Sequence, residues 1–154
     1  MELEDLVQPE GVVAHLKVTS KKQALQELSE RAAKITGLSE RAIFETLLER
    51  ERLGSTGVGQ GIAIPHGKLP EIDRLHGLFA RLDTPIDFES VDDQPVDLIF
   101  LLLAPETAGA DHLKALAGVS RMLRNESIAE RLRGAKNDEA LYAMLVDAEA
   151  RDAA

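Results

Sequence analysis

The sequence predicts an α/β domain in which helices pack on both faces of a small, mixed β-sheet. Segments with apolar residues at helical spacing alternate with short β-branched runs along the chain. One run, 96–103, is almost continuously aliphatic between Pro95 and Pro105, which is typical of a strand covered on both faces. The chain has 154 residues, no internal repeat and no linker-like stretch, so we expect a single domain, 1–154, with its core at about 5–148.

Three further segments are predicted as strands. Residues 12–18 follow a short helical turn over 3–9 and form the first strand. Ile62, Ala63 and Ile64 form a second one, which Pro65 ends because proline lacks a backbone donor. Residues 78–82 alternate apolar and polar positions, as in a half-buried strand. Turns are predicted at Thr84-Pro85 and at 92–95.

The helices are predicted from their first and last residues. Ser20 and Gln23 fit a capping box at the start of the first long helix, and Gly37 marks its end. Ser39 caps a second helix, which runs into a glycine-rich loop at Gly54. The remaining helices are expected over 111–124, from a capping box at Ser127–Glu130, and around Leu141, Met144, Leu145 and Ala148.

The composition disfavours or excludes several classes of function. Asp and Glu number 27 against 18 Lys and Arg, so the net charge of -9 repels nucleic acid and anionic membranes. The absence of cysteine excludes disulfides, thiolate zinc sites and a cysteine nucleophile. The first residues do not resemble a secretory signal, and the longest strongly apolar run, 98–104, is too short to span a membrane. We therefore expect a cytoplasmic protein without membrane insertion.

The most unusual stretch is GSTGVGQGIAIPHGK, residues 54–68. It does not fit a nucleotide-binding loop, because Gln60-Gly61 stands where a P-loop needs Lys and then Ser or Thr. The dinucleotide-binding fingerprint fails as well, since Ile62 occupies the position of its last glycine. His66 follows Pro65 directly at the predicted end of a strand. Such a position presents a side chain for binding or catalysis.

Metal and serine-hydrolase chemistry find no support in the sequence. No pair among the four histidines has the helical spacing of metal ligands, and no GxSxG elbow is present. We therefore predict no metal and no cofactor.

Helical geometry places two more residues close to the protein body. His112 lies in the first turn of the helix predicted over 111–124, on its apolar face and near free N–H groups that favour an anion. Arg50 lies at the edge of the second helix's apolar stripe, whereas Arg52 is predicted on the opposite, solvated side. Each residue alone has an ordinary structural explanation. Together with His66, they suggest a site for an anionic group.

These residues carry a recognisable pattern. Arg50, the glycine run 54–59 and the segment 61–67 resemble the active-site stretch of enzyme IIA proteins of the fructose–mannitol class. That class belongs to the phosphoenolpyruvate-dependent phosphotransferase system. The resemblance covers essentially the whole chain, including the segments 94–98, 111–113 and 138–141. Within the class, the chain looks most similar to the stand-alone nitrogen-regulatory enzyme IIA.

The resemblance implies a phosphotransferase-type phosphocarrier with a phosphohistidine intermediate. His66 would accept the phosphoryl group, as a tele-phosphohistidine, from an HPr-like donor protein. Arg50 matches the family's phosphate-stabilising arginine, and His112 matches its second active-site histidine. Thr56 and Gly57 are weaker candidates for contacts to phosphate oxygens. Partner proteins of unknown identity would read the phosphorylation state, and no cofactor or metal is implied.

Two alternatives remain open at the level of sequence. The first is a sugar-transport IIA that passes its phosphoryl group to a permease IIB domain. The second is a binding module whose glycine-rich loop docks a protein and whose His66 is never phosphorylated.

Overall fold

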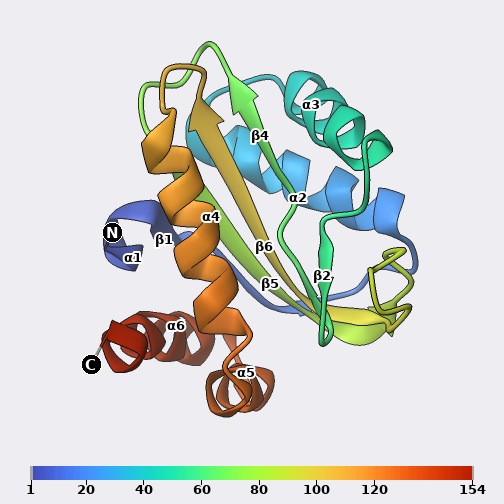
Figure 1. Ribbon diagram of the computed structural model, residues 1–154, viewed down its shortest axis with the longest axis vertical. Coiled ribbons are helices and arrows are strands. Elements are labelled where there is room, and N and C mark those ends of the chain that lie inside the picture. Colours follow the sequence, from blue (N-terminus) through green and yellow to red (C-terminus); the bar gives the residue numbers. More distant parts are fainter. Residues whose placement is uncertain (1, 154) are drawn as a thin grey trace.

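A computed structural model describes residues 2–153, in which six helices and six strands are interleaved along the chain (Figure 1). The elements are α1 (Leu3–Leu6), β1 (Val7–Leu16), α2 (Lys21–Thr36), α3 (Glu40–Arg52), β2 (Gly57–Gly59), β3 (Ile62–Ala63), β4 (His66–Leu69), β5 (His76–Ile86), β6 (Val96–Pro105), α4 (Ala110–Leu123), α5 (Glu126–Arg133) and α6 (Asp138–Ala153).

All six strands belong to one mixed sheet, as predicted. The strand order is β1-β5-β6-β3-β2, and β4 also pairs with β6. The central pair β5–β6 is antiparallel, whereas β1 runs parallel to β5, and both β3 and β4 run parallel to β6. The strand β6 therefore has β5 on one side and both β3 and β4 on the other.

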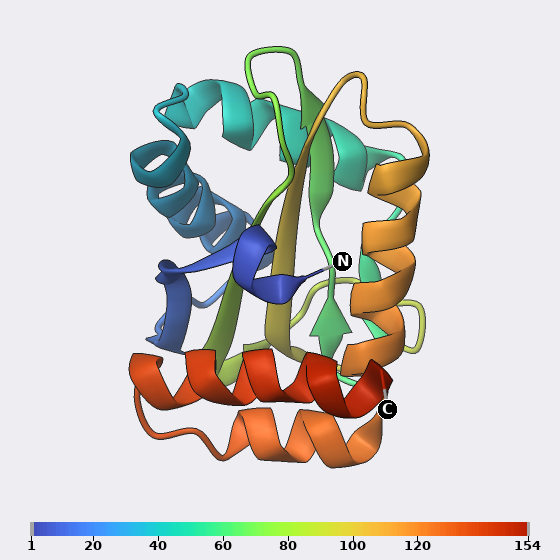
Figure 2. The same cartoon turned by 90° about the vertical axis from the view of Figure 1, so that its left-hand side faces the viewer.

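Helices cover both faces of the sheet. Figure 2 shows α2 and α3 on one face and α4 on the other, while α5 and α6 pack beneath one end. The core is correspondingly divided into two apolar clusters, one on each face. The strand β6 contributes to both: Leu98, Phe100 and Leu102 face one cluster, and the alternate residues face the other. The prediction that this strand is covered on both faces is confirmed.

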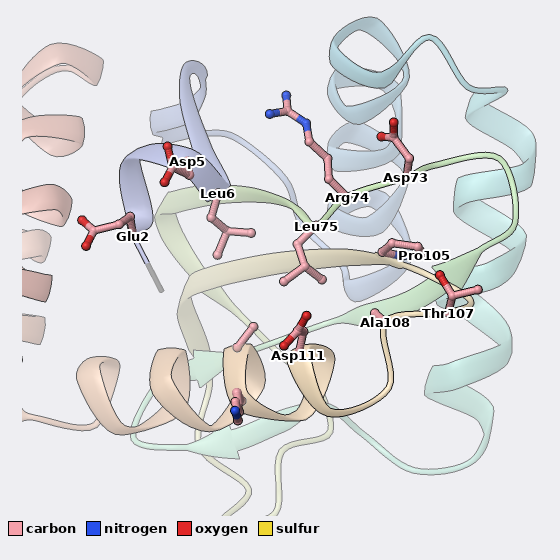
Figure 3. A pocket seen from close by; sticks show the side chains of 12 residues that line it. Glu2, Asp5, Leu6, Asp73, Arg74, Leu75, Pro105, Thr107, Ala108 and Asp111 are labelled. Atoms are coloured by element: carbon pink, nitrogen blue, oxygen red, sulfur yellow. The ribbon is translucent and has the colours of Figure 1, made fainter.

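The layer containing α1 and α4 leaves a hollow of about 800 Å³ beside the first turn of α4 (Figure 3). Acidic and basic side chains share its lining, among them Asp5, Asp73, Arg74 and Asp111. None of the five predicted site residues, His66, Arg50, His112, Thr56 and Gly57, lines it.

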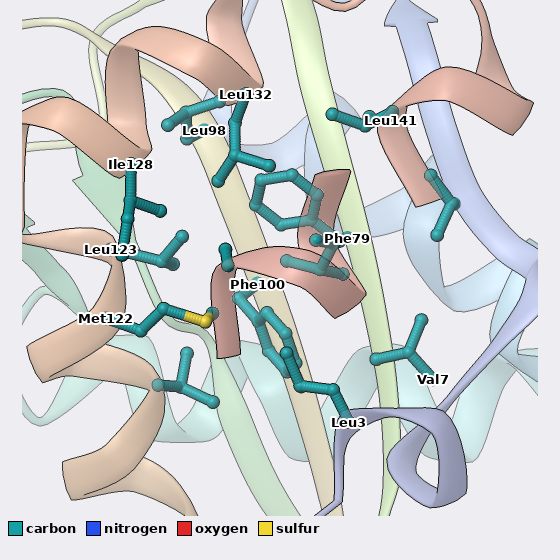
Figure 4. Close-up of a cluster of buried hydrophobic side chains, with 14 of the residues drawn as sticks. Leu3, Val7, Phe79, Leu98, Phe100, Met122, Leu123, Ile128, Leu132 and Leu141 are labelled. Atoms are coloured by element: carbon teal, nitrogen blue, oxygen red, sulfur yellow. The ribbon is translucent and has the colours of Figure 1, made fainter. Parts of the chain in front are cut away.

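Phe79 and Phe100 stand at the centre of the cluster on the α4 side (Figure 4). Their ring centroids lie 6.1 Å apart in a tilted arrangement, and both side chains are fully buried. Leucines, Met122 and Ile128 from α1 and from the three C-terminal helices surround them. Two of the five aromatic residues of the sequence thus form the centre of this cluster.

Two predicted breaks fall inside strands. The helical turn ends at Leu6 rather than Pro9, and β1 begins at Val7. The predicted turn at Thr84-Pro85 lies within β5. In both places the pairing register shifts: between Val7 and Val12 in β1, and between Arg81 and Ile86 in β5. A strand tolerates proline at such an irregularity because the missing N–H is not needed there. The strand β5 is also buried on both faces over residues 77–80, and not half-buried as predicted.

Most of the predicted helix ends are confirmed. Ser20 accepts a hydrogen bond from the Gln23 N–H, Ser39 accepts one from Ala42, and Gly37 ends α2 with a left-handed φ of 78°. The capping box at Ser20 is only half correct, because the Gln23 side chain accepts from the N–H of Thr19 instead. The predicted N-cap of α5, Ser127, is wrong. Asn125 caps this helix and accepts from two backbone N–H groups, so that it begins at Glu126, one residue before Ser127.

Within residues 2–153, no helix combines the length and the apolar character that crossing a membrane requires.

Candidate functional site

His66 is the first residue of β4, and the two short strands β3 and β4 are parts of one interrupted strand. Ile62 pairs with Leu98, and His66 pairs with Leu102. The register is identical on both sides of the interruption, because every residue pairs with the one 36 positions later in β6. The break occurs at Pro65, which has no N–H but still accepts a bond of 2.9 Å from Leu102 through its carbonyl. His66 therefore begins a strand, rather than merely following one as the sequence predicted.

The hydrogen bonds of the His66 ring define its tautomer. Nδ1 lies 2.8 Å from the carbonyl oxygen of Ile64, which can only accept, so Nδ1 carries the proton. Nε2 lies 3.2 Å from Nε of Arg50, which can only donate, so Nε2 holds a lone pair. The ring is neutral, and its unprotonated nitrogen faces the arginine.

Arg50 reaches the site from the last turn of α3. Besides its bond to His66, it donates from Nη1 to the carbonyl oxygen of Gly54 at 3.0 Å. The guanidinium is thus held from two directions, by the histidine and by the turn that follows the helix. Arg50, which helical geometry placed close to the protein body, thus points toward His66.

His112 lies in the first turn of α4, against His66. The two ring centroids are 5.6 Å apart, and the rings meet edge to face at 79°. The side chain is only 6% exposed, and its Nε2 has no hydrogen-bond partner among the described residues. A buried polar atom without a partner costs about 1–3 kcal/mol, and a ligand that completes the bonding is one explanation for it. The structure thus brings together all three residues that the sequence singled out.

Electrostatics keep both histidines neutral. Burial lowers the pKa of His66, and the charge of Arg50 acts in the same direction, while the bond to the Ile64 carbonyl opposes them. Burial also lowers the pKa of His112, with smaller contributions from His66 and Lys68. Around neutral pH, the lone pair on His66 is therefore available to an electrophile.

These side chains line a depression of about 630 Å³ between the end of α3, the start of β4 and the start of α4. Lys68 lies on its wall, and so does Arg52, which is exposed as predicted but does not lie on the opposite side. Leu53 also lines it and is 85% exposed. The depression combines three cationic side chains and one carboxylate, Glu49, with two histidines. Its cations outnumber its acidic groups, which suits an anionic group.

Close packing of α3 against β4 explains the glycine after the histidine. A Cβ at Gly67 would lie 2.6 Å from Cγ2 of Thr46, closer than side chains approach. Only glycine lets the helix that carries Arg50 come this near to the strand that carries His66.

Thr56 and Gly57, the weaker candidates, use their donors elsewhere. The hydroxyl and the N–H of Thr56 both bond to the carboxylate of Glu51, and the N–H of Gly57 bonds to Ser55. Neither residue lines the depression at His66. Their contact with phosphate stays a prediction, which requires these bonds to open. Glu51 was missed by the sequence reasoning, because a glutamate in the last turn of a helix gives no sign of being buried.

The two remaining histidines lie away from this depression. His15 lies on β1, where Nδ1 is 2.8 Å from Asp83 and Nε2 is 2.7 Å from the carbonyl oxygen of Lys136. His76 begins β5 and pairs with Leu103. Neither lines the depression at His66, consistent with the absence of a predicted role.

Comparisons with known proteins give a consistent answer. The family model "Phosphoenolpyruvate-dependent sugar phosphotransferase system, EIIA 2" matches residues 5–148. A nitrogen regulatory protein of Bradyrhizobium diazoefficiens is 63% identical over 94% of this chain and 95% of its own length. That of Escherichia coli K12 is 45% identical over 97% of this chain and 92% of its own. The crystal structure of the nitrogen regulatory protein IIA-Ntr from Neisseria meningitidis is 36% identical, with a TM-score of 0.88 over 93% of this chain and 98% of that one. The chain therefore belongs to the EIIA type 2 family of the phosphotransferase system, and the relatives it resembles here are nitrogen regulatory proteins.

Proposed function

We propose that this protein is a cytoplasmic phosphocarrier of the nitrogen-regulatory type, and that His66 is its phosphoryl acceptor. The donor is an HPr-like protein that carries a phosphohistidine. The phosphorylation state of His66 is then read by partner proteins. Membership of the family supports a role in phosphotransfer, and the geometry around His66 supports the specific acceptor.

The observation that carries the proposal is the orientation of the His66 ring. Because Nδ1–H is donated to the Ile64 carbonyl, Nε2 is the only nitrogen of the His66 ring with a lone pair that can attack phosphorus. In the transfer, Nε2 attacks phosphorus while the phosphorus–nitrogen bond of the donor breaks, and its electron pair returns to the donor's imidazole. The product is the tele-phosphohistidine that the family resemblance implies.

Arg50 occupies the place where the phosphoryl group arrives. In the resting state its Nε–H bonds to Nε2 itself, 3.2 Å away. As the new bond forms, the guanidinium moves its donors from the nitrogen to the phosphoryl oxygens, where charge-assisted bonds are stronger. Transfer of this kind depends on positioning and charge stabilisation, which these side chains supply.

His112 provides a further group on the other side of His66. Its buried Nε2, unpaired among the described residues, lies in a ring packed against that of the acceptor. In the tautomer protonated at Nε2, it donates to a phosphoryl oxygen and thereby satisfies its own hydrogen-bonding capacity. The added charge of about -1.5 to -2 is then shared among Arg50, Lys68 and this donor.

The test is a reconstituted phosphorylation. The chain is incubated with labelled phosphoenolpyruvate and the two upstream phosphotransferase proteins, and the site is mapped by mass spectrometry at alkaline pH, because phosphohistidine is acid-labile. We expect labelling that disappears in His66→Ala and persists in the matched control His76→Ala. Nitrogen NMR of the phosphoprotein identifies Nε2 as the modified atom.

Three results contradict parts of this proposal. Labelling that survives in His66→Ala removes the acceptor assignment. Wild-type protein that takes no label favours the binding-module alternative. Rapid transfer of the label to a sugar permease IIB domain favours the transport alternative over the regulatory one.

A further inference from the structure

Glu51 is a buried carboxylate that the proposed transfer does not use. It follows Arg50 in the last turn of α3, yet it is only 7% exposed. A buried carboxylate needs partners, and Glu51 has three donors around it. The Thr56 N–H lies 3.1 Å from Oε1, the Thr56 hydroxyl donates to Oε2, and Lys21 Nζ lies 2.8 Å from Oε1.

Lys21 fixes the other end of this arrangement. It belongs to the first turn of α2, and its ammonium lies 5.1 Å from the ring centroid of Phe88. A second carboxylate, Glu89, lies 3.6 Å from the same nitrogen. The group therefore joins the start of α2 to the end of α3 through a desolvated ion pair.

The first link from this group leads to Arg50. The chain after α3 folds back so that Thr56 reaches the Glu51 carboxylate, and the Gly54 N–H donates to the Glu51 carbonyl at 3.1 Å. The turn enclosed in this way presents the Gly54 carbonyl to Nη1 of Arg50 at 3.0 Å. The orientation of the guanidinium thus depends on a turn that Glu51 closes.

The second link leads to His66. The carbonyl of Thr56 accepts a bond of 3.0 Å from the N–H of Ile64. The carbonyl of Ile64 in turn accepts the Nδ1–H that sets the tautomer of His66. Thr56 therefore lies between Glu51 and both members of the reacting pair.

We infer that Lys21, Glu51 and Thr56 form a positioning group that holds Arg50 and His66 in their mutual orientation for phosphotransfer. The effect on phosphotransfer rests on the proposed function. The hydrogen bonds that connect the group to Arg50 and His66, however, are present in the unphosphorylated protein. Stability alone explains the group poorly, because a buried ion pair is often no better than apolar residues of the same volume. Its connections to both reacting side chains give a different reason for its presence.

The experiment compares three variants of the full chain. Thr56→Val removes the hydroxyl and keeps the shape, whereas Thr56→Ser keeps the hydroxyl and serves as the rescue. Glu45→Gln is the matched control, because Glu45 lies on the same helix but is exposed and pairs only with Arg41 among the described residues. Two quantities are measured: water exchange of the Arg50 Nε–H by NMR in unphosphorylated protein, and the single-turnover rate of transfer from the phosphorylated donor.

In Thr56→Val we expect the exchange of the Arg50 Nε–H to accelerate by about tenfold or more. The transfer rate should fall roughly 10- to 100-fold, because small displacements of a positioning group have effects of that size. The apparent affinity for the donor should stay unchanged, since Thr56 is buried and does not face it. Thr56→Ser and Glu45→Gln should behave like the wild type in both measurements.

An unchanged Arg50 signal in folded Thr56→Val overturns the inference, whatever the transfer rate. A perturbed Arg50 signal with a wild-type transfer rate shows that the link exists but overturns its positioning role in phosphotransfer. Should Thr56→Val fail to fold, Glu51→Gln replaces it, because the amide keeps the volume and the bond to the Thr56 N–H. The same two measurements on that variant then decide, and an unperturbed Arg50 signal again overturns the inference.

Discussion

Replacing Arg50 by methionine tests the electrostatic part of the proposed transfer. Methionine keeps most of the apolar stem and removes every donor. The variant loses the bond to Nε2 of His66 and the bond to the Gly54 carbonyl. It therefore lacks the hydrogen-bond donors that we expect to bind the phosphoryl oxygens in the transition state.

The size of the effect follows from the bonds involved. A charge-assisted hydrogen bond is worth about 1.5–3 kcal/mol. At about 1.4 kcal/mol for each factor of ten, the transfer rate should fall about 10- to 150-fold. The variant also loses the hydrogen bond between Arg50 and His66 in the unphosphorylated protein. This raises the free energy of the starting state and therefore offsets part of the decrease in transfer rate. We therefore expect a decrease toward the lower end of that range.

The assay is single-turnover transfer from the phosphorylated donor at mildly alkaline pH. This condition matters because the charge of Arg50 helps to lower the pKa of His66, so the variant's histidine protonates more readily in acid. Arg52→Met is the matched control, since Arg52 lines the same depression but is exposed and forms no bond to His66. A rate for Arg50→Met within threefold of the wild type, or an equal loss in Arg52→Met, would refute the reasoning.

Three further predictions concern pH and packing. Because burial lowers the pKa of His66, the transfer rate should stay level around neutral pH and fall only in acid, on the low side of the ordinary value of 6.5, in step with the NMR titration of His66. The bonds to the Lys136 carbonyl and to Asp83 raise the pKa of His15, so His15→Gln should lower the midpoint of urea unfolding in acid. The difference in midpoint between variant and wild type should disappear as the pH rises through that raised pKa, and a difference that stays constant with pH contradicts this. Gly67→Ala should cost roughly 1–3 kcal/mol in urea unfolding, because its methyl would lie 2.6 Å from a side chain of α3, and an unchanged midpoint would show that the helix adjusts freely.

The sequence predicted the parts of the fold that local chemistry determines. The aliphatic run of β6 and the caps at Ser20, Ser39 and Gly37 are encoded within a few residues, and all are found. The prolines at positions 9 and 85 misled the prediction, because their acceptability depends on pairing irregularities between distant strands. Such irregularities are properties of the assembled sheet and leave no local pattern.

The same distinction applies to the candidate site. His66, Arg50 and His112 could be proposed from the sequence, because each has a local signal. His66 follows Pro65 at a predicted strand end, Arg50 and His112 lie at defined positions on predicted helices, and all three match the family pattern. Glu51 and Lys21 were missed, because their pairing joins the end of one helix to the start of another. On the sequence alone, both residues look like ordinary surface charges near helix ends.

The unbroken register across Pro65 has a consequence for how the site can vary. His66 is fixed along β6 by strand pairing, and β6 leads at its end into the helix that carries His112. Both histidines therefore lie on elements joined through β6, whereas Arg50 belongs to a helix packed against β4. Substitutions where α3 packs against β4 can therefore change the distance between the arginine and the histidines without changing the strand pairing that fixes His66 along β6.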